Sequence, residues 1–211
     1  AAHERGLKVS AHIFALSDAK SLLRAQVDAF AHSVRDREID DELLALARER
    51  RSLVLNPNLT SRGEPTNVDW LKTVIPAADL AALEQKNVVR TEDQQSFSIQ
   101  ANNLRRMKDA GVRIVLGTDT SFDFPGGNTP WAAHIEMEDM AAAGMTPTEV
   151  IAAATATAAE FLGLRNVGTI EAGKVADLLV LDADPLVSIT NTRRISAVYL
   201  RGKKVDRAQY P

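Results

Sequence analysis

Short apolar runs alternate along this chain with segments of helical periodicity. The apolar runs lie at 7–12, 27–32, 52–55 and 112–119, and turn residues follow each of them. Continuous apolar runs of this length are typical of buried parallel strands, and their alternation with helices is typical of βαβ units. The pattern therefore predicts an α/β fold built on a parallel sheet.

The helical segments carry start and stop signals. Helices are expected over Asp18–Gln26 with Ser17 as N-cap, after an N-cap at Asp40, and over Phe97–Ala110, His134–Ala143 and Pro147–Gly163. Thr146 and Glu149 have the spacing of a capping box, and proline follows at the first helical position. Gly111 is placed to end the third of these helices in the left-handed conformation. These signals support helices between the strands.

Residues 60–95 interrupt the regular alternation. Pro57 cannot continue a central strand, and from Thr60 onward the pattern is irregular, with only short helical pieces. A segment of this length inside a compact domain usually covers a pocket or moves. It follows the end of a strand at which pockets form in barrels, so we expect a long insertion that serves as a lid.

The chain changes character near residue 166. Glycines separate short alternating strands at Asp177–Asp182 and Ala197–Arg201. We therefore expect two parts: an α/β part over 1–165 and a small β appendage over 166–211.

Composition removes several classes of function. The 211 residues are 45% hydrophobic, which is enough for one substantial core. Lys and Arg number 25 against 28 Asp and Glu, a net charge of −3, so nucleic acid is not an expected partner. No apolar stretch reaches the roughly 18 residues that span a bilayer, and the first residues lack the order of a signal peptide. No membrane partner is expected, and cytoplasm is the expected location.

Three apolar runs end in or just before a residue that can bind a metal: His12, His32 and Asp119. Side chains at the C-terminal ends of parallel barrel strands converge on one pocket. The chain has no Cys, so any metal must rest on imidazole and carboxylate groups, which suit zinc or a similar divalent ion. Each residue also has a structural alternative, because histidines are common in cores and Asp119 could serve as a turn residue or a helix cap.

The segment Gly168–Pro185, which follows the helix Pro147–Gly163, resembles the C-terminal signature of the amidohydrolase superfamily, close to its imidazolonepropionase and prolidase-like branches. The resemblance implies that the chain is the C-terminal half of a TIM (β/α)8 barrel, strands 5–8 with their helices, plus part of a small β-sandwich. The His-x-His pair of the family's first strand does not occur here. The chain is therefore expected to be a fragment of a longer protein.

The same resemblance implies the roles of the candidate residues. His12, His32 and Asp119 correspond to metal ligands at the ends of strands 5, 6 and 8, and Asp119 also to the catalytic base. The expected cofactor is a divalent ion, zinc by preference, with one or two ions in the complete protein. The implied reaction is hydrolysis of amides, ureas, cyclic C–N bonds or peptides by metal-activated water.

Other polar and aromatic residues have open roles. His134 is expected to be structural, on a helix that packs against the barrel wall. Contact with substrate and a purely structural role stay open for two sets of residues: the loop Phe122–Pro130 with Trp131, and Asn56, Asn58 and Arg62.

Two hypotheses of other classes compete with an enzyme. A half barrel exposes raw sheet edges, so the chain could be a catalytically silent assembly module that pairs with an N-terminal half or with a second copy of itself. A flavodoxin-like binding domain would need a Gly-rich phosphate loop after the first strand, and the residues after His12 supply none.

Overall fold

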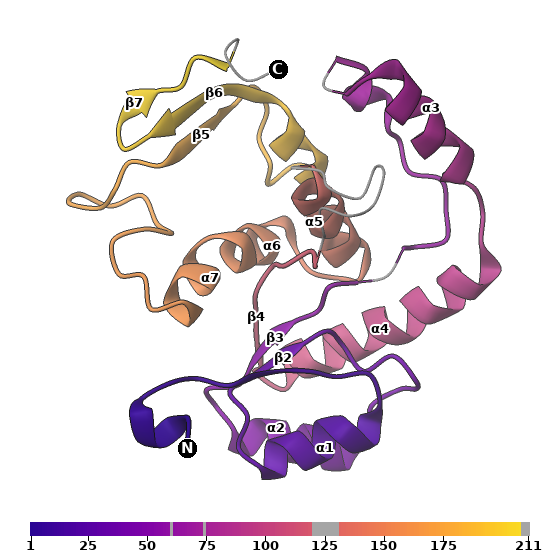
Figure 1. Ribbon diagram of the computed structural model, residues 1–211, viewed down its shortest axis with the longest axis vertical. Helices are drawn as coiled ribbons and strands as arrows, with labels where there is room; N and C mark the ends of the chain where they lie inside the picture. The colour runs from indigo at the N-terminus through magenta and orange to yellow at the C-terminus, as the bar shows by residue number, and fades with distance from the viewer. Residues whose placement is uncertain (60, 74, 120–130, 208–211) are drawn as a thin grey trace.

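The first part of the chain forms an open parallel sheet (Figure 1). The computed structural model describes residues 1–59, 61–73, 75–119 and 131–207. The strands are β1 (Ser10–His12), β2 (Ala29–Ala31), β3 (Val54–Asn56) and β4 (Arg113–Ile114), and they pair in parallel in the order β1-β2-β3-β4. The predicted α/β fold with a parallel sheet is confirmed. Within the described residues the sheet does not close into a barrel, so the half-barrel assignment stays a prediction.

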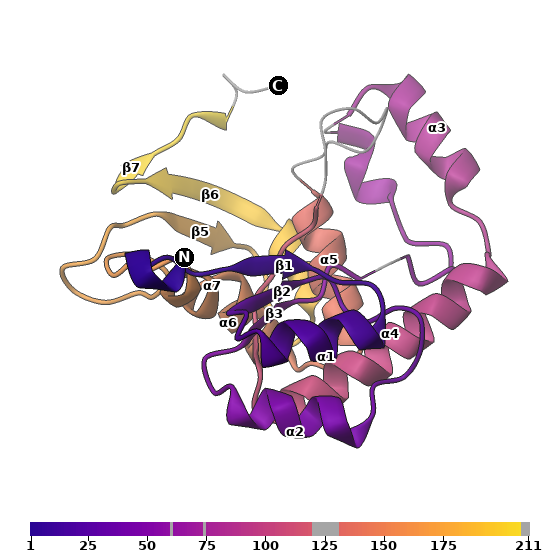
Figure 2. The same cartoon turned by 60° about the horizontal axis from the view of Figure 1, so that its bottom comes forward.

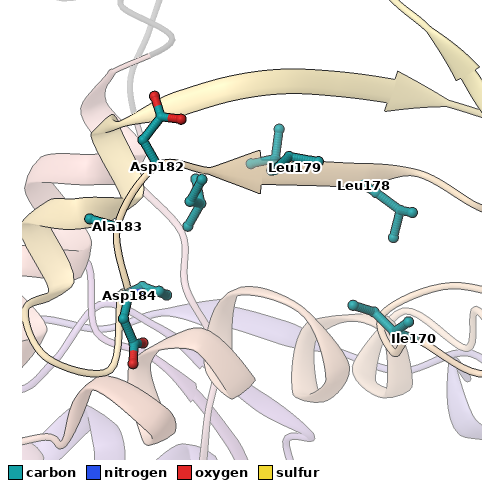
Figure 3. A pocket seen from close by; sticks show the side chains of 9 residues that line it. Ile170, Leu178, Leu179, Asp182, Ala183 and Asp184 are labelled. Carbon is teal, nitrogen blue, oxygen red and sulfur yellow. The ribbon is translucent and has the colours of Figure 1, made fainter.

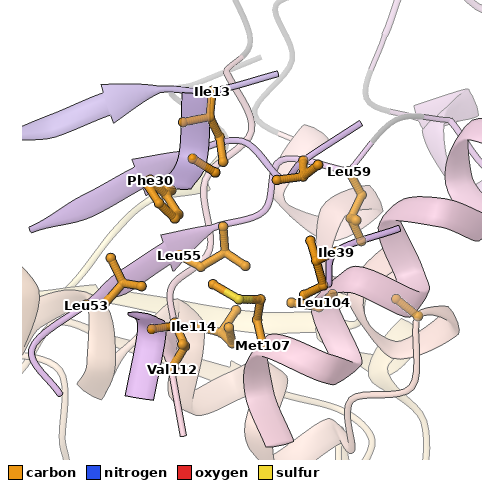
Figure 4. Close-up of a cluster of buried hydrophobic side chains, with 14 of the residues drawn as sticks. Ile13, Phe30, Ile39, Leu53, Leu55, Leu59, Leu104, Met107, Val112 and Ile114 are labelled. Carbon is orange, nitrogen blue, oxygen red and sulfur yellow. The ribbon is translucent and has the colours of Figure 1, made fainter. Parts of the chain in front are cut away.

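The two faces of this sheet have different partners because alternate residues of a strand point to opposite sides. Phe30 and Leu55 are paired in register, and Leu55 is paired with Ile114, so their side chains form one buried row. This row packs against α4, as Figure 4 shows for Leu104 and Met107. The opposite face carries a smaller apolar group beside α7, formed by Ala29, Val54 and Val115 with Ala158 and Phe161.

Helices α1 (Leu16–Arg24) and α2 (Asp41–Glu49) follow the first two strands. The expected cap of α2 is confirmed, because the Asp40 side chain accepts the N–H of Leu43. The expected cap of α1 is wrong. That helix begins at Leu16, and its first N–H donates to Asp36 Oδ1 at 2.9 Å, so a residue from the next loop takes the place expected for Ser17.

Residues 60–95 contain the short helical pieces expected there, and a longer helix begins among them earlier than expected. They include η2 (Asp69–Thr73) and α3 (Ala77–Lys86), and α4 (Thr91–Asp109) begins well before Phe97. The first turn of α4 lacks an apolar stripe, but its acidic residues favour a helix N-terminus. In Figure 1 the segment that contains α3 lies away from the sheet. This segment has a small apolar cluster of its own around Leu71.

The helices after β4 are α5 (Ala132–Ala142), α6 (Pro147–Ala154) and α7 (Ala156–Phe161). The capping box of Thr146 and Glu149 is confirmed, and Gly111 takes the expected left-handed conformation with φ +89°. The single helix expected over 147–163 is interrupted at Thr155, where φ is −129° and ψ is −88°. There the carbonyl of Ala153 accepts the N–H of Leu116 from the segment after β4, at 3.1 Å.

The last part of the chain is a small antiparallel sheet. It contains β5 (Leu178–Leu181), β6 (Ile195–Leu200) and β7 (Lys203–Lys204), in the order β5-β6-β7. The short helix η3 (Ile189–Arg193) connects β5 to β6 and packs on α5, and Figure 2 shows the appendage beside α6 and α7. In the described part of the chain, no helix is long and apolar enough to cross a membrane.

Candidate metal-binding site

His12, His32 and Asp119 lie together at the C-terminal edge of the parallel sheet. His12 ends β1 and is paired in register with Ala31, so His32 follows directly beside it. The two imidazole centroids are 4.6 Å apart in an edge-to-face arrangement. On the other side, His32 Nε2 lies 3.7 Å from Asp119 Oδ2. His32 is thus the central member of the cluster.

The backbone at this edge is unusual. His32, Asn58 and Asp119 all have positive φ, at 76°, 48° and 48°. Residues other than glycine rarely take this left-handed conformation, which costs on the order of 1–3 kcal/mol each and concentrates at functional sites. The three residues follow three different strands. Such a concentration of left-handed residues is expected at a functional site rather than at ordinary strand ends.

Exposure differs sharply among the three. His12 and Asp119 are exposed, with 72% of the Asp119 side chain accessible, whereas only 8% of His32 is accessible. Burial is the main cause that lowers the pKa of His32, the positive charges of Arg35 and His12 lower it further, and Asp119 and Asn58 oppose the shift. A lowered pKa keeps the imidazole neutral at neutral pH, the state that binds metals.

The donor chemistry fits a divalent ion, but the arrangement is incomplete. Two imidazoles and one carboxylate are ligands that zinc accepts, and zinc normally takes four. Among the described residues, no three His, Asp or Glu side chains are arranged closely enough to hold an ion. A metal would therefore need the exposed His12 and Asp119 side chains to turn toward it, together with a further donor.

Arg35 is a neighbour of His32 that the sequence reasoning missed. Its Nη2 lies 3.3 Å from His32 Nδ1 and 2.7 Å from the carbonyl oxygen of Asn58. A guanidinium only donates, so Nδ1 accepts and the neutral ring carries its proton on Nε2. Binding of a metal through Nε2 would require that proton to move to Nδ1. The hydrogen bond from Arg35 to Nδ1 would then be lost. The sequence shows an arginine three residues after a candidate ligand, but it does not show that the arginine side chain points toward the His32 ring.

The loop after β3 supports the same edge. The carbonyl of Asn56 accepts the N–H of His32 at 2.8 Å. The Asn56 side chain lies against Gly117, where an added Cβ would be only 2.3 Å from Nδ2. Asn56 thus contacts the strands that lead to both His32 and Asp119. Arg62 is engaged elsewhere, in an ion pair with Asp139 whose Nε–Oδ1 distance is 2.7 Å.

Two buried carboxylates on α5 also escaped the sequence reasoning. Burial raises the pKa of Glu136 to about 8, although the N–H groups of Leu59 and Asn58 and the charge of Arg35 oppose the shift. Burial likewise raises the pKa of Asp139 to about 7, against its pairing with Arg62. Both look like ordinary helix-surface residues in the sequence, and only tertiary packing makes them buried acids.

The remaining sequence candidates lie elsewhere. His134 Nδ1 is 2.9 Å from Thr192 Oγ1, and the ring packs edge-to-face with Trp70, as a structural histidine would. Trp131 packs on the apolar cluster around Leu71. The loop Phe122–Pro130 lies outside the described residues. His3 Nε2 lies 2.7 Å from Asp28 Oδ2, which precedes β2 and is thus away from the C-terminal edge.

Two hollows lined by described residues lie away from the three candidate ligands. One, shown in Figure 3, has a volume of ≈ 610 Å³ and lies along β5 between Ile170 and the turn at Asp182 and Asp184. Another, of ≈ 770 Å³, lies between α5–α7 and the same strand. Both are largely apolar, and the second belongs to the contact between the helices and the appendage.

Comparison with known proteins assigns this chain to a class of protein. A sequence model of the amidohydrolase family matches residues 1–205. The chain therefore belongs to the amidohydrolase family.

Imidazolonepropionases are among the similar sequences, and solved hydrolase structures are similar in fold. The imidazolonepropionase of Streptomyces griseus subsp. griseus is 35% identical over 143 residues, which covers 63% of this chain and 35% of that protein. The structure of molinate hydrolase is similar with a TM-score of 0.71 and 25% identity, covering 99% of this chain and 44% of that one. A Xaa-Pro dipeptidase with methionine bound in its active site shares the fold, with a TM-score of 0.70, 22% identity and coverage of 97% and 46%.

The chain is much shorter than these similar proteins. It spans about a third of the length of its curated relative and less than half of each of the two solved chains. The activity of a whole protein of this family is therefore a proposal for this chain.

Proposed function

We propose that this chain carries part of the metal centre of a hydrolase that cleaves amide or other C–N bonds with metal-activated water. The supporting observation is the cluster of His12, His32 and Asp119 at the C-terminal edge of the sheet, in a chain that belongs to the amidohydrolase family. Binding sites of barrels of this type lie at that edge.

The two histidines and the aspartate have different roles in this proposal. His12 and His32 supply imidazole nitrogens, and Asp119 supplies a carboxylate oxygen. A divalent ion bound there, zinc by preference and one or two in the whole protein, would acidify a water molecule and polarise the scissile carbonyl. Asp119, which is exposed and beside His32, accepts the proton of the attacking water and passes it to the leaving nitrogen.

The substrate class is a small molecule with an amide, urea, cyclic C–N or peptide bond. The relatives include an imidazolonepropionase, and the fold is shared with a Xaa-Pro dipeptidase. One scaffold thus accommodates different leaving groups, and the loops after the strands select among them. Asn56 and Asn58 lie on such a loop, which contacts the backbone of His32.

The first test measures bound metal and hydrolysis together in the protein that contains this chain. The His12→Gln, His32→Gln and Asp119→Asn variants are each expected to bind less zinc, and Asp119→Asn also to lose turnover. His3→Gln is the matched control, because it removes a histidine that hydrogen-bonds Asp28 away from the site. Unchanged zinc content in all three site variants would refute the proposal.

A second candidate function is assembly, and the exposed apolar residues around β1 favour it. Leu7 is 59% exposed, Val9 37% and Phe14 54%, and β1 is an edge strand of the described sheet. We propose that a further barrel half, from the same polypeptide or from a second copy, covers this edge. Light scattering of the purified chain tests this proposal: a well-folded monomer at high concentration would contradict it.

A further inference from the structure

Glu136 is a buried carboxylate directed at the loop that supports His32. It lies on α5, which supplies none of the candidate ligands, and only 5% of it is exposed. Its Oε1 accepts the N–H of Leu59 at 3.1 Å, and the N–H of Asn58 is a second donor to the same carboxylate. Burying such a group is costly unless hydrogen bonds compensate, and these two N–H donors supply that compensation.

The loop held by Glu136 continues directly to the candidate site. The carbonyl of Asn56 accepts the N–H of His32 at 2.8 Å, and the carbonyl of Pro57 accepts the N–H of Ser33 at 3.1 Å. Residues 56–59 thus bond to Glu136 through their last two N–H groups and to the backbone of His32 and Ser33 through their first two carbonyls. A shift of this loop would move the backbone of His32.

Arg35 connects the same loop to the imidazole ring itself. Its Nη2 is within hydrogen-bond distance of both the Asn58 carbonyl and His32 Nδ1. Asp119, and Glu136 when it is ionised, also attract the Arg35 guanidinium. The loop position therefore determines where the guanidinium lies, and the guanidinium determines which ring nitrogen of His32 accepts a hydrogen bond.

We infer that Glu136 is a positioning residue for His32: its carboxylate fixes residues 56–59, and this loop together with Arg35 fixes the orientation and the tautomer of the imidazole. The inference rests on the proposed function only where metal affinity is concerned. The orientation of His32 in the metal-free protein is a separate property and is measured separately. Outer groups that orient ligating histidines typically change metal affinity 10–100-fold when they are removed.

The other ionisable groups around Glu136 do not reach His32 in this way. Asp139 lies next along the same helix and is occupied by Arg62. Glu138 pairs with Arg193 of η3, on a different side of α5, and both partners of that pair are about 10% exposed. Glu138 is thus a largely covered carboxylate of the same helix that pairs away from the loop beside the site, whereas Glu136 contacts that loop.

The experiment reads the four histidines of the metal-free, ¹⁵N-labelled protein by long-range ¹H–¹⁵N NMR, with His32 assigned from its Gln variant. The wild-type protein is expected to show His32 as one tautomer with Nδ1 unprotonated. Glu136→Leu, which removes the acceptor, is expected to give a mixture of tautomers. Glu136→Gln, whose amide oxygen can still accept both N–H groups, is expected to restore the wild-type signals.

Glu138→Leu is the matched control, because it removes a carboxylate of the same helix whose side chain is only 10% exposed. It is expected to leave the His32 signals unchanged. An equal disturbance by both Leu variants would mean general loosening of α5 and would overturn the inference, as would unchanged His32 signals in a folded Glu136→Leu protein.

If Glu136→Leu does not fold, Arg35→Met carries the same test, since it removes the donor to Nδ1 and keeps an unbranched side chain. An undisturbed tautomer in that variant would overturn the inference. Zinc titration is the second readout: because the Nε2–H tautomer must be lost before Nε2 binds zinc, Glu136→Leu is expected to change the affinity about 10-fold or more, and Glu138→Leu to change it little. Failure of every form to bind zinc would count against the proposed function, while the tautomer result would still decide the role of Glu136.

Discussion

Replacing Glu136 with Gln should change how the stability of the protein depends on pH. The pKa of the Glu136 carboxyl rises from 4.5 to about 8 in the folded protein, mainly because the group is buried. Between these two values the folded state holds a proton that the unfolded state has lost. The free energy of unfolding therefore falls as the pH rises from about 5 to about 8, and it levels off above that pH.

The magnitude depends on the size of the shift. Each pH unit within this window corresponds to at most about 1.4 kcal/mol, so the whole window is worth up to about 5 kcal/mol. Asp139, on the same helix, has a pKa raised from 3.8 to about 7, so the two acids titrate as an interacting pair. A loss of about 2–5 kcal/mol is therefore expected for Glu136 alone. That is a large part of the roughly 5–15 kcal/mol that stabilises an ordinary domain.

Urea unfolding of the wild type and of Glu136→Gln at pH 5, 6, 7, 8 and 9 measures this difference. The neutral Gln variant is expected to become the more stable protein as the pH rises. Titrations of groups that do not interact with Glu136 cancel in the comparison, whereas that of Asp139 changes with the substitution. Glu160→Gln changes an exposed carboxylate that pairs with Arg113 and is the matched control. Parallel stability curves for the wild type and Glu136→Gln would refute the reasoning that burial of this carboxyl controls its protonation.

Three further predictions concern the site and the core. Asp119→Asn removes the proposed proton acceptor and is expected to lower turnover about 10²–10⁴-fold in the complete enzyme, measured with zinc content; near-normal turnover would exclude that role. Gly117→Ala would place a Cβ 2.3 Å from Asn56 Nδ2, so a stability loss of about 1–3 kcal/mol and weaker zinc binding are expected; wild-type zinc binding would mean that the contact is unimportant. Leu104→Ala empties a fully buried position and should cost about 2–5 kcal/mol in urea unfolding, against less than about 0.5 kcal/mol for Leu162→Ala, which is 67% exposed; equal effects would contradict the assigned core.

The features that sequence analysis predicted well are those that neighbouring residues determine. The cap at Asp40, the capping box at Thr146 and the left-handed Gly111 all depend on atoms only a few residues apart. Where a distant residue intervenes, the prediction failed. Asp36 replaced the expected cap of α1, and the Ala153 carbonyl bonds the segment after β4 where a continuous helix was expected.

The candidate site divides in the same way. His12, His32 and Asp119 could be selected from the sequence because each follows an apolar run, and parallel strands bring their C-terminal ends to one edge. Their roles as ligands stay a prediction. Arg35 and Glu136 could not be selected, because their roles depend on contacts with distant segments and their burial has no local pattern.

The sequence by itself determined the alternation of strands and helices, the helix starts at Asp40 and Thr146 and the residues capable of metal chemistry, since these depend on side-chain type and short-range spacing. Only the tertiary structure decided how those residues are held. The orientation of His32 depends on a loop, an arginine and a buried carboxylate from three separate segments, 56–59, Arg35 and Glu136. The protonation of that carboxylate depends on how much water its neighbours exclude, a property that exists only when the whole chain is packed.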